Sequence, residues 1–226
     1  MADTTRKQRA AAETQRAAAG KERAAAQWLA QPHAAIDHIR TRIRQHEYRP
    51  IADDEAAITH AVLVPFYVLG GELHIVLTKR TDLVSMQQGH IAFPGGRREP
   101  EDPDLLAAAL RESAEEIGLA PADVEVFGRL DDFWTRGGKM FVAGFAGLID
   151  PAMSPYPWRA QEREVAEILE VPVRHVLDPR NVEVAEPREV IGRMWPNETF
   201  VFRGHRVFGA TARTLRHVLE LALGAG

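Results

Sequence analysis

The chain reads Gly95-Gly96-Arg97-Arg98-Glu99-Pro100-Glu101-Asp102 and then, further along, Arg111-Glu112-Ser113-Ala114-Glu115-Glu116-Ile117-Gly118-Leu119. We expect a helix from Pro103 to Gly118, because proline is favoured in a first helical turn and glycine just past a helix end. At about 100° per residue, Glu112, Glu115 and Glu116 fall within one arc of this helix. Leu106, Leu110 and Ile117 fall nearly opposite. The pattern predicts a helix that buries one face and presents three carboxylates from the other.

Three carboxylates at this spacing repel one another, and each like-charge pair on a helix costs a few tenths of a kcal/mol. A hard divalent cation such as Mg²⁺ or Mn²⁺ would turn this repulsion into binding, because both cations prefer oxygen ligands. Arg111 could orient one carboxylate through a bidentate pair. Taken alone, such a cluster is more typical of a solvated acidic helix face. The preceding Gly95-Gly96 loop favours the cation, since glycines let the backbone approach a cation and a phosphate closely.

The surrounding pattern alternates strands and helices. Residues 58–69 and 73–78 are apolar and rich in β-branched side chains, and Gly70-Gly71 between them predicts a β-hairpin. Pro65 cannot donate to a ladder, so we expect it at a sheet edge or a bulge. Helices are expected over 34–45 and 210–223, and further strands over 90–93, 124–130, 140–148, 165–171 and 199–203. These elements predict an α/β fold, an α/β/α sandwich around a mixed β-sheet.

Composition limits the classes of function. The chain has 226 residues, 45% of them apolar and 27% charged, which is typical of globular domains. The net charge of −4 gives no basic field for nucleic acid. The absence of cysteine excludes disulfides and thiolate chemistry, so a metal must be held by oxygen or imidazole, and the nine histidines lack the His-x3-His spacing of a helical zinc site. Without an apolar run of roughly 18 residues, we expect no membrane span and a cytoplasmic protein.

Residues 1–30 differ from the rest of the chain. They contain 11 alanines, six basic and three acidic residues, and Trp28 and Leu29 are their only large apolar side chains. Such a segment cannot build a core, so we expect a disordered tail or an undocked helix. Residues 31–226 are expected to form one catalytic domain.

The first segments quoted resemble the Nudix box, which reads Gly-x5-Glu-x7-Arg-Glu-apolar-x-Glu-Glu-x-Gly-apolar. Residues 111–119 match it, with Ser113 at a usually apolar position. Asp102 stands where the first Glu is counted from Gly96, and eight residues rather than seven separate it from Arg111. The resemblance marks residues 31–226 as a Nudix hydrolase domain.

A longer pattern is similar to the coenzyme A pyrophosphatase branch of this family. It covers roughly residues 34–223 and includes Leu77-Thr78-Lys79-Arg80, Ala92-Phe93-Pro94-Gly95-Gly96, Val165-Ala166-Glu167-Ile168-Leu169-Glu170-Val171-Pro172 and Arg206-Val207-Phe208-Gly209-Ala210-Thr211-Ala212. The chain departs from the branch at Gln87-Gln88-Gly89-His90, where His-x-Gly-Gln is usual, and at Met140-Phe141-Val142-Ala143, where a Thr-Pro pair is usual.

The resemblance implies a pyrophosphohydrolase that uses Mg²⁺ or Mn²⁺ to split a nucleoside diphosphate derivative into two monophosphates. Coenzyme A or acyl-coenzyme A would give 4′-phosphopantetheine and 3′,5′-ADP. The alternatives are hydrolysis of ADP-ribose or NADH, and a Nudix-fold binding module without catalysis. The implied catalytic residues are Arg111, Glu112, Glu115 and Glu116, and the implied metal site holds Glu112, Glu115, Glu116 and Gly96.

Several further residues are candidates for the site. A general base could be a box glutamate or one of Glu162, Glu164 and Glu167. Substrate phosphates could be bound by Lys79, Arg80, Gly95, Arg97 and Arg98, although strand alternation lets only one of Lys79 and Arg80 face the site. Phe133 or Trp134 could stack on adenine, but a packing role is commoner for such aromatics, and His90 is expected to be structural. The expected partner is a small nucleotide rather than nucleic acid or membrane, and a homodimer is left open.

Overall fold

The computed structural model describes residues 31–50, 57–81, 89–135, 140–190 and 193–223. The tail over 1–30 and the first two residues of the Gln87–His90 segment lie outside these ranges. The helices are α2 (Pro32–Arg44), α3 (Leu105–Ile117), α4 (Val173–Leu177) and α5 (Gly209–Leu223). The strands are β1 (Ile58–Leu69), β2 (Glu72–Arg80), β3 (Ile91–Ala92), β4 (Gly95–Arg97), β5 (Val124–Arg129), β6 (Phe133–Thr135), β7 (Met140–Ile149), β8 (Val165–Pro172), β9 (Val182–Val190), β10 (Arg193–Phe202) and β11 (His205–Val207).

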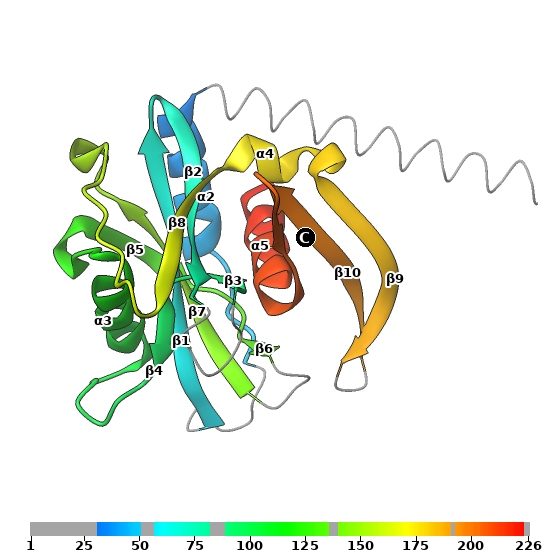
Figure 1. The fold of residues 1–226 in the computed structure, drawn as a ribbon, viewed down its shortest axis with the longest axis horizontal. Coiled ribbons are helices and arrows are strands. Elements are labelled where there is room, and N and C mark those ends of the chain that lie inside the picture. The colour runs from blue at the N-terminus through cyan, green and yellow to red at the C-terminus, as the bar shows by residue number, and fades with distance from the viewer. Residues whose placement is uncertain (1–30, 51–56, 82–88, 136–139, 191–192, 224–226) are drawn as a thin grey trace, which may run out of the picture.

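Eight of the strands form one mixed sheet. Its main order is β3-β2-β1-β7-β5, while β4 pairs with β1, β6 with β7 and β8 with β2. The β1–β7 pair is parallel and the other pairs are antiparallel. In Figure 1, α3 lies on one face of this sheet, and α2 and α5 lie on the other. The expected α/β/α sandwich around a mixed sheet is therefore confirmed.

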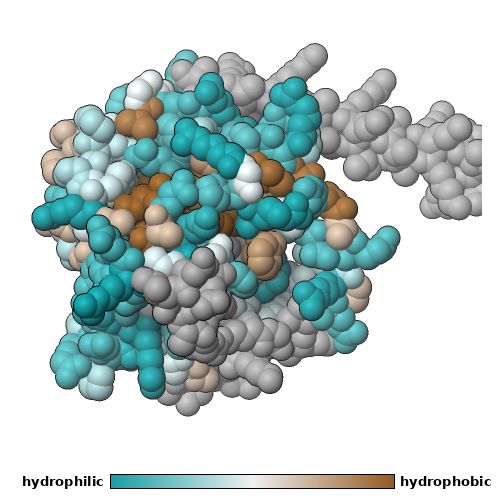
Figure 2. All heavy atoms as spheres, viewed as in Figure 1, coloured by the Kyte–Doolittle hydropathy of each residue, from teal (hydrophilic) through white to brown (hydrophobic). Residues whose placement is uncertain are grey.

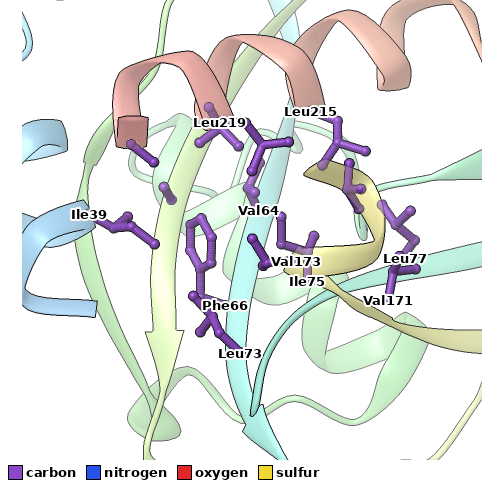
Figure 3. Packing of buried hydrophobic residues seen from close by; sticks show 14 of the residues in the cluster. Ile39, Val64, Phe66, Leu73, Ile75, Leu77, Val171, Val173, Leu215 and Leu219 are labelled. Atoms are coloured by element: carbon purple, nitrogen blue, oxygen red, sulfur yellow. The ribbon is translucent and has the colours of Figure 1, made fainter. Parts of the chain in front are cut away.

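Alternation along β1 divides the core into two layers. The side chains of Val64, Phe66 and Val68 join the apolar cluster that includes α2 and α5. Ala61, Leu63 and Tyr67, at odd-numbered positions, join the cluster with α3. Since successive side chains of a strand point to opposite faces, β1 supplies both cores at once. Figure 3 shows the first layer, where Phe66 and Val64 lie with Leu215 and Leu219 of α5 and with Ile39 of α2.

The expected place of Pro65 was wrong, because β1 is a central strand and not an edge. On one side β1 pairs with β7 through this region, with Pro65 opposite Gly147. On the other side, residues 60–62 pair with β4 and residues 66–69 pair with β2. Pro65 thus lies where β1 passes from one partner strand to the next, a position that tolerates a residue without an N–H.

The Gly-Gly segment is also not the loop that was expected. Gly95 and Gly96 begin β4 and lie opposite Val62 and Ala61 of β1. A Cβ on Gly95 would lie 2.3 Å from the Ala61 carbonyl oxygen, so no larger residue fits between the strands. The glycines therefore bring a short strand onto β1 in the layer next to α3.

Helix α3 starts two residues later than predicted and ends as predicted. Asp104 caps it, since its Oδ1 accepts a hydrogen bond from the Ala107 N–H at 2.8 Å. Gly118 ends the helix in the left-handed conformation, with φ of 71°. Both ends of the helix that carries the glutamates are therefore defined by local hydrogen bonds.

A second sheet of three antiparallel strands, β11-β10-β9, follows the first. Only residues 199–203 of it were predicted. Strand β9 is largely exposed and rich in charged residues, and its register with β10 shifts between Trp195 and Asn197, beside Pro196. Such a strand lacks the apolar alternation that identifies strands in a sequence. The β9–β10 hairpin packs through Phe200 and Phe202 into the cluster with α5.

The surface shown in Figure 2 is mainly hydrophilic, with hydrophobic residues in separate patches. Among the described residues, no helix has the length and apolar character needed to cross a membrane.

Candidate active site

The three glutamates of α3 differ sharply in exposure. The side chains of Glu115, Glu112 and Glu116 are 59%, 17% and 6% exposed. The sequence predicted three carboxylates on an open face, so the burial of Glu116 is a correction. Its cause is β4, whose Gly95 N–H donates a hydrogen bond to Glu116 Oε2 at 3.2 Å.

Gly96 provides the space for the second carboxylate. A Cβ at this position would lie 2.4 Å from Glu112 Cδ and 2.6 Å from each of its carboxylate oxygens. Any side chain at residue 96 would therefore displace Glu112. The two glycines of β4 thus have different roles. Gly95 binds Glu116 through its amide, and Gly96 leaves room for Glu112.

Arg111 joins the acidic groups. Its Nε and Nη2 donate to the two carboxylate oxygens of Asp102, each at 3.0 Å. The same guanidinium reaches Glu112 Oε1 at 3.1 Å and Glu115 Oε2 at 3.0 Å, and Nη2 also donates to the Arg97 carbonyl at 2.9 Å. Asp102 is itself buried and accepts the Glu99 N–H at 2.8 Å. Arg111 is therefore held on one side by Asp102 and β4 and contacts two glutamates on the other.

Burial and crowding change the acidity of the cluster. Burial, opposed by the Gly95 hydrogen bond and the Arg80 charge, raises the pKa of Glu116 to about 7. Burial also raises the pKa of Glu112, although Arg111 acts in the opposite direction. The charges of Glu112 and Glu164 raise the pKa of Glu116 further. A cation at this point would relieve the repulsion and favour the ionised carboxylates.

The cluster opens into a cavity of about 1310 Å³. Around it lie the three glutamates, Arg111, Arg80, Gly95, Gly96 and Arg97 from the predicted set. The Arg80 Nη1 atom lies 3.8 Å from Glu116 Oε1. Its neighbour Lys79, opposite Ile91 and Glu167 in the sheet, does not line the cavity. The arrangement places several carboxylates and cationic side chains at one wall of a space large enough for a nucleotide derivative.

Comparison with known proteins shows which family contains the residues of this site. The sequence model of the NUDIX domain matches residues 59–192, which include β4, Asp102 and all of α3. The chain belongs to the Nudix family. It is thus a Nudix pyrophosphohydrolase, and Nudix hydrolases generally use divalent metal ions.

The similarity to curated Nudix proteins covers more of the chain than the domain match does. The peroxisomal coenzyme A diphosphatase NUDT7 of Mus musculus is 33% identical over 145 residues, which are 64% of this chain and 60% of the mouse protein. The Nudix hydrolase NudL of Salmonella paratyphi B is 35% identical over 168 residues, covering 74% of this chain and 82% of NudL. NudL of Salmonella dublin is 32% identical over 197 residues, covering 84% and 95%.

Among solved structures, the Nudix hydrolase RenU from M. smegmatis is similar to this chain with a TM-score of 0.47 and 20% identity, covering 72% of this chain and 86% of RenU.

The two departures from the Nudix box have local explanations. Ser113 is fully buried, and its hydroxyl donates to the Ala109 carbonyl at 2.7 Å, so the helix satisfies it internally. Asp102 reaches Arg111 despite the extra residue between them. Neither departure disturbs the contacts of the glutamates.

The remaining candidates of the Nudix domain are distributed unevenly. Glu164 lines the cavity, whereas Glu167 pairs with His205 at 3.1 Å and Glu162 does not reach the cavity wall. Arg98 donates to the carbonyls of Asp102 and Pro103, which fixes the loop before α3. Phe133, Trp134 and His90 line the cavity, and the His90 ring lies 5.1 Å from that of Phe208.

Sequence reasoning missed two groups of residues. The first is another part of the cavity wall, which β9, β10 and α5 supply with Arg188, Trp195, Arg213 and Thr214. The second is a group of His46, Asp131 and His217, whose ligand atoms lie within 4.8 Å of one another. His46 Nε2 lies 2.7 Å from Asp131 Oδ1 and His217 Nε2 lies 3.6 Å from Oδ2. Spacing within one helix could not reveal this group, because its members come from three separate segments.

Proposed function

We propose that this chain hydrolyses the pyrophosphate of coenzyme A or acyl-coenzyme A, with Mg²⁺ or Mn²⁺, to 4′-phosphopantetheine and 3′,5′-ADP. One observation carries the proposal: Glu112 and Glu116 are held by β4 and Arg111 at the wall of a large cavity. The name of the mouse relative, a coenzyme A diphosphatase, supports this choice of substrate.

The residues fit a divalent metal of this kind. The donor set consists of carboxylate oxygens, which Mg²⁺ and Mn²⁺ prefer. Gly96 leaves free the space beside Glu112 that a Cβ would fill. We assign Glu112 and Glu116 as the main ligands, with Glu115, the most exposed of the three, in support. When bound, the metal neutralises charge on the phosphate oxygens and makes water a better nucleophile.

The chain's own residues then position the reaction. Arg111 holds Glu112 and Glu115 in place, and Asp102 holds Arg111. The Gly95 amide keeps Glu116 turned toward the cavity. Arg80 and Arg97 lie on the same wall and are suited to bind phosphate oxygens as charge-assisted donors.

We assign the general base to Glu164. It lines the cavity and its charge acts on both Glu112 and Glu116. Glu162 and Glu167, the other acids weighed from the sequence, are not on the cavity wall. A base must reach the attacking water, and only Glu164 of these three faces the cavity.

The test is product analysis by mass spectrometry. The full chain with Mg²⁺ or Mn²⁺ is given coenzyme A, acyl-coenzyme A, ADP-ribose or NADH. Glu116→Gln serves as the inactive variant and Glu101→Gln, an exposed acid in the preceding loop, as the matched control. Metal-dependent release of 4′-phosphopantetheine and 3′,5′-ADP by wild type and Glu101→Gln supports the proposal. Cleavage of ADP-ribose or NADH alone overturns the proposed substrate, as does a failure to cleave both coenzyme A and acyl-coenzyme A.

A further inference from the structure

The cavity has a second polar wall, built from residues outside the Nudix box. Trp134 of β6, Arg188 of β9, Trp195 of β10, and Arg213 and Thr214 of α5 all line the same cavity as the glutamates. We call these five residues the tryptophan–arginine recess. None of them belongs to the catalytic set proposed above.

The two tryptophan rings of the recess lie beside the Arg213 guanidinium. Trp134 and Trp195 pack edge to face, with their centroids 4.8 Å apart and their planes at 80°. The guanidinium carbon of Arg213 lies 5.9 Å from the Trp134 ring and 6.0 Å from the Trp195 ring. Arg213 Nη2 also donates to the Trp134 carbonyl at 2.8 Å. Arg213 is therefore positioned by neutral groups.

Arg213 has no acidic partner among the residues that the structure describes. Burial lowers the pKa of Arg213, and the charge of Arg188 lowers it further. Arg216, three residues further along the same helix, shows the usual arrangement, since it forms two hydrogen bonds with the Glu198 carboxylate at 2.7 and 2.8 Å. Among the described residues, the half-buried Arg213 thus lacks the carboxylate that normally accompanies a buried cation.

Other donors of the recess are also without partners. Trp134 Nε1, Trp195 Nε1 and Thr214 Oγ1 are all buried, and none has a hydrogen-bond partner among the residues that the structure describes. Trp134 and Thr214 are each 4% exposed. Buried polar groups in proteins are nearly always hydrogen-bonded, so these donors, together with Arg213, indicate a place for an acceptor.

We propose that the recess is a second anion site, which binds a phosphate monoester on the nucleoside of the substrate, outside the pyrophosphate that is cleaved. Arg213 and Arg188 bind the phosphate, and the face of Trp195, the more exposed of the two tryptophans, packs on the base. This inference rests on the proposed function, because coenzyme A carries such a phosphate at its ribose 3′ position. Dephospho-coenzyme A, ADP-ribose and NADH lack it. The recess therefore selects the phosphorylated nucleotide.

The binding test uses products, which need no turnover. Calorimetry without metal compares 3′,5′-ADP, 5′-AMP and inorganic phosphate on the full-length wild type, Arg213→Gln and the matched control Arg216→Gln. We expect wild type and Arg216→Gln to bind 3′,5′-ADP at least about tenfold more tightly than 5′-AMP, as for one charge-assisted contact. Arg213→Gln should bind both alike. Equal binding of both nucleotides by wild type overturns the proposal, as does a preference that persists in Arg213→Gln. Phosphate that binds as tightly as 3′,5′-ADP also overturns it, since the site would then be one for free phosphate.

A folding defect is separated from a binding defect by Arg213→Lys, which keeps the charge and should retain part of the preference. Kinetics separate this inference from the proposed function. If coenzyme A and dephospho-coenzyme A are cleaved with the same KM by wild type and Arg213→Gln, the hydrolase stands and the recess proposal fails. If neither is cleaved while the preference for 3′,5′-ADP still depends on Arg213, the recess proposal stands and the proposed hydrolysis of coenzyme A fails.

Discussion

Gly96 and Glu112 fit together so closely that residue 96 can carry no side chain. An added Cβ would lie 2.4 Å from the carboxyl carbon of Glu112, and it would meet both oxygens at 2.6 Å. The contact joins a strand of the sheet to the helix that carries the acidic cluster. It therefore links the placement of the carboxylate to the pairing of β4 with β1.

Gly96→Ala should displace Glu112 while leaving the fold intact. We expect kcat/KM to fall by about 10²-fold, as for a misplaced catalytic group, and the metal affinity to fall with it. Gly128→Ala is the control, because its Cβ would meet only Ile43 at an ordinary 3.4 Å. Steady-state kinetics over a range of Mg²⁺ concentrations measure both effects. Equal losses in the two variants would mean that strand damage, not Glu112, explains the result.

Glu116→Gln should remove a metal ligand and keep the structure. The expected result is a fall in kcat of about 10³-fold, which corresponds to roughly 4 kcal/mol of transition-state stabilisation. Circular dichroism checks the fold, and single-turnover measurements check the chemical step. Unchanged metal-dependent turnover would contradict the assignment of Glu116.

The raised pKa of Glu116 predicts how stability depends on pH. A group with a pKa of about 7 in the folded protein and about 4.5 when unfolded stabilises the fold below pH 4.5, and this stabilisation is lost as pH rises toward 7. Metal-free wild type should therefore lose stability relative to Glu116→Gln between pH 4.5 and 7, by on the order of 3 kcal/mol. Denaturant unfolding in EDTA at several pH values measures the difference. Mg²⁺ at pH 8 should restore the wild type only. A difference between the two proteins that does not vary with pH would contradict the burial of an ionisable Glu116.

The contribution of Asp102 to folding stability depends on pH in the opposite direction to that of Glu116. The hydrogen bond from Arg111 lowers the pKa of this buried carboxyl. Its stabilisation is therefore present above its ordinary pKa of about 3.8 and is lost as pH falls further. Asp102→Asn should cost about 1 to 3 kcal/mol at pH 7, and the cost should shrink below pH 4. Thermal unfolding of both proteins between pH 3 and 7 checks this, and a cost that stays constant over that range would show that packing rather than charge is responsible.

The sequence was sufficient for the parts of the molecule that depend on local pattern. The Gly118 end of α3, the β1–β2 hairpin and the grouping of Glu112, Glu115 and Glu116 on one helix all follow from short-range spacing. The burial of Glu116 did not follow, because it depends on β4, a strand of three residues whose two glycines are typical of a loop.

The part of the cavity wall that β9, β10 and α5 supply could not be predicted from the sequence for a related reason. Trp195 lies on a hairpin whose partner strand β9 is largely exposed and charged, so no apolar alternation marks it. Arg213 was hidden in an ordinary amphipathic helix, and nothing in the sequence showed that it would lack a carboxylate. Contacts such as that between Arg213 and Trp134, or between His46 and Asp131, join residues about 80 positions apart, which periodicity cannot detect.

The central place of β1 has a consequence for how the protein moves. Amides of a strand that is paired along both edges exchange with solvent only in the largest opening events of a fold. β4 is paired with this strand, so the Gly95 amide that binds the Glu116 carboxylate is attached to the centre of the large sheet. Within the described part of the chain, the β9–β10 hairpin pairs in the small sheet and not with the large one. We therefore expect the part of the cavity wall that β9 and β10 supply to open more readily than the part that carries the glutamates.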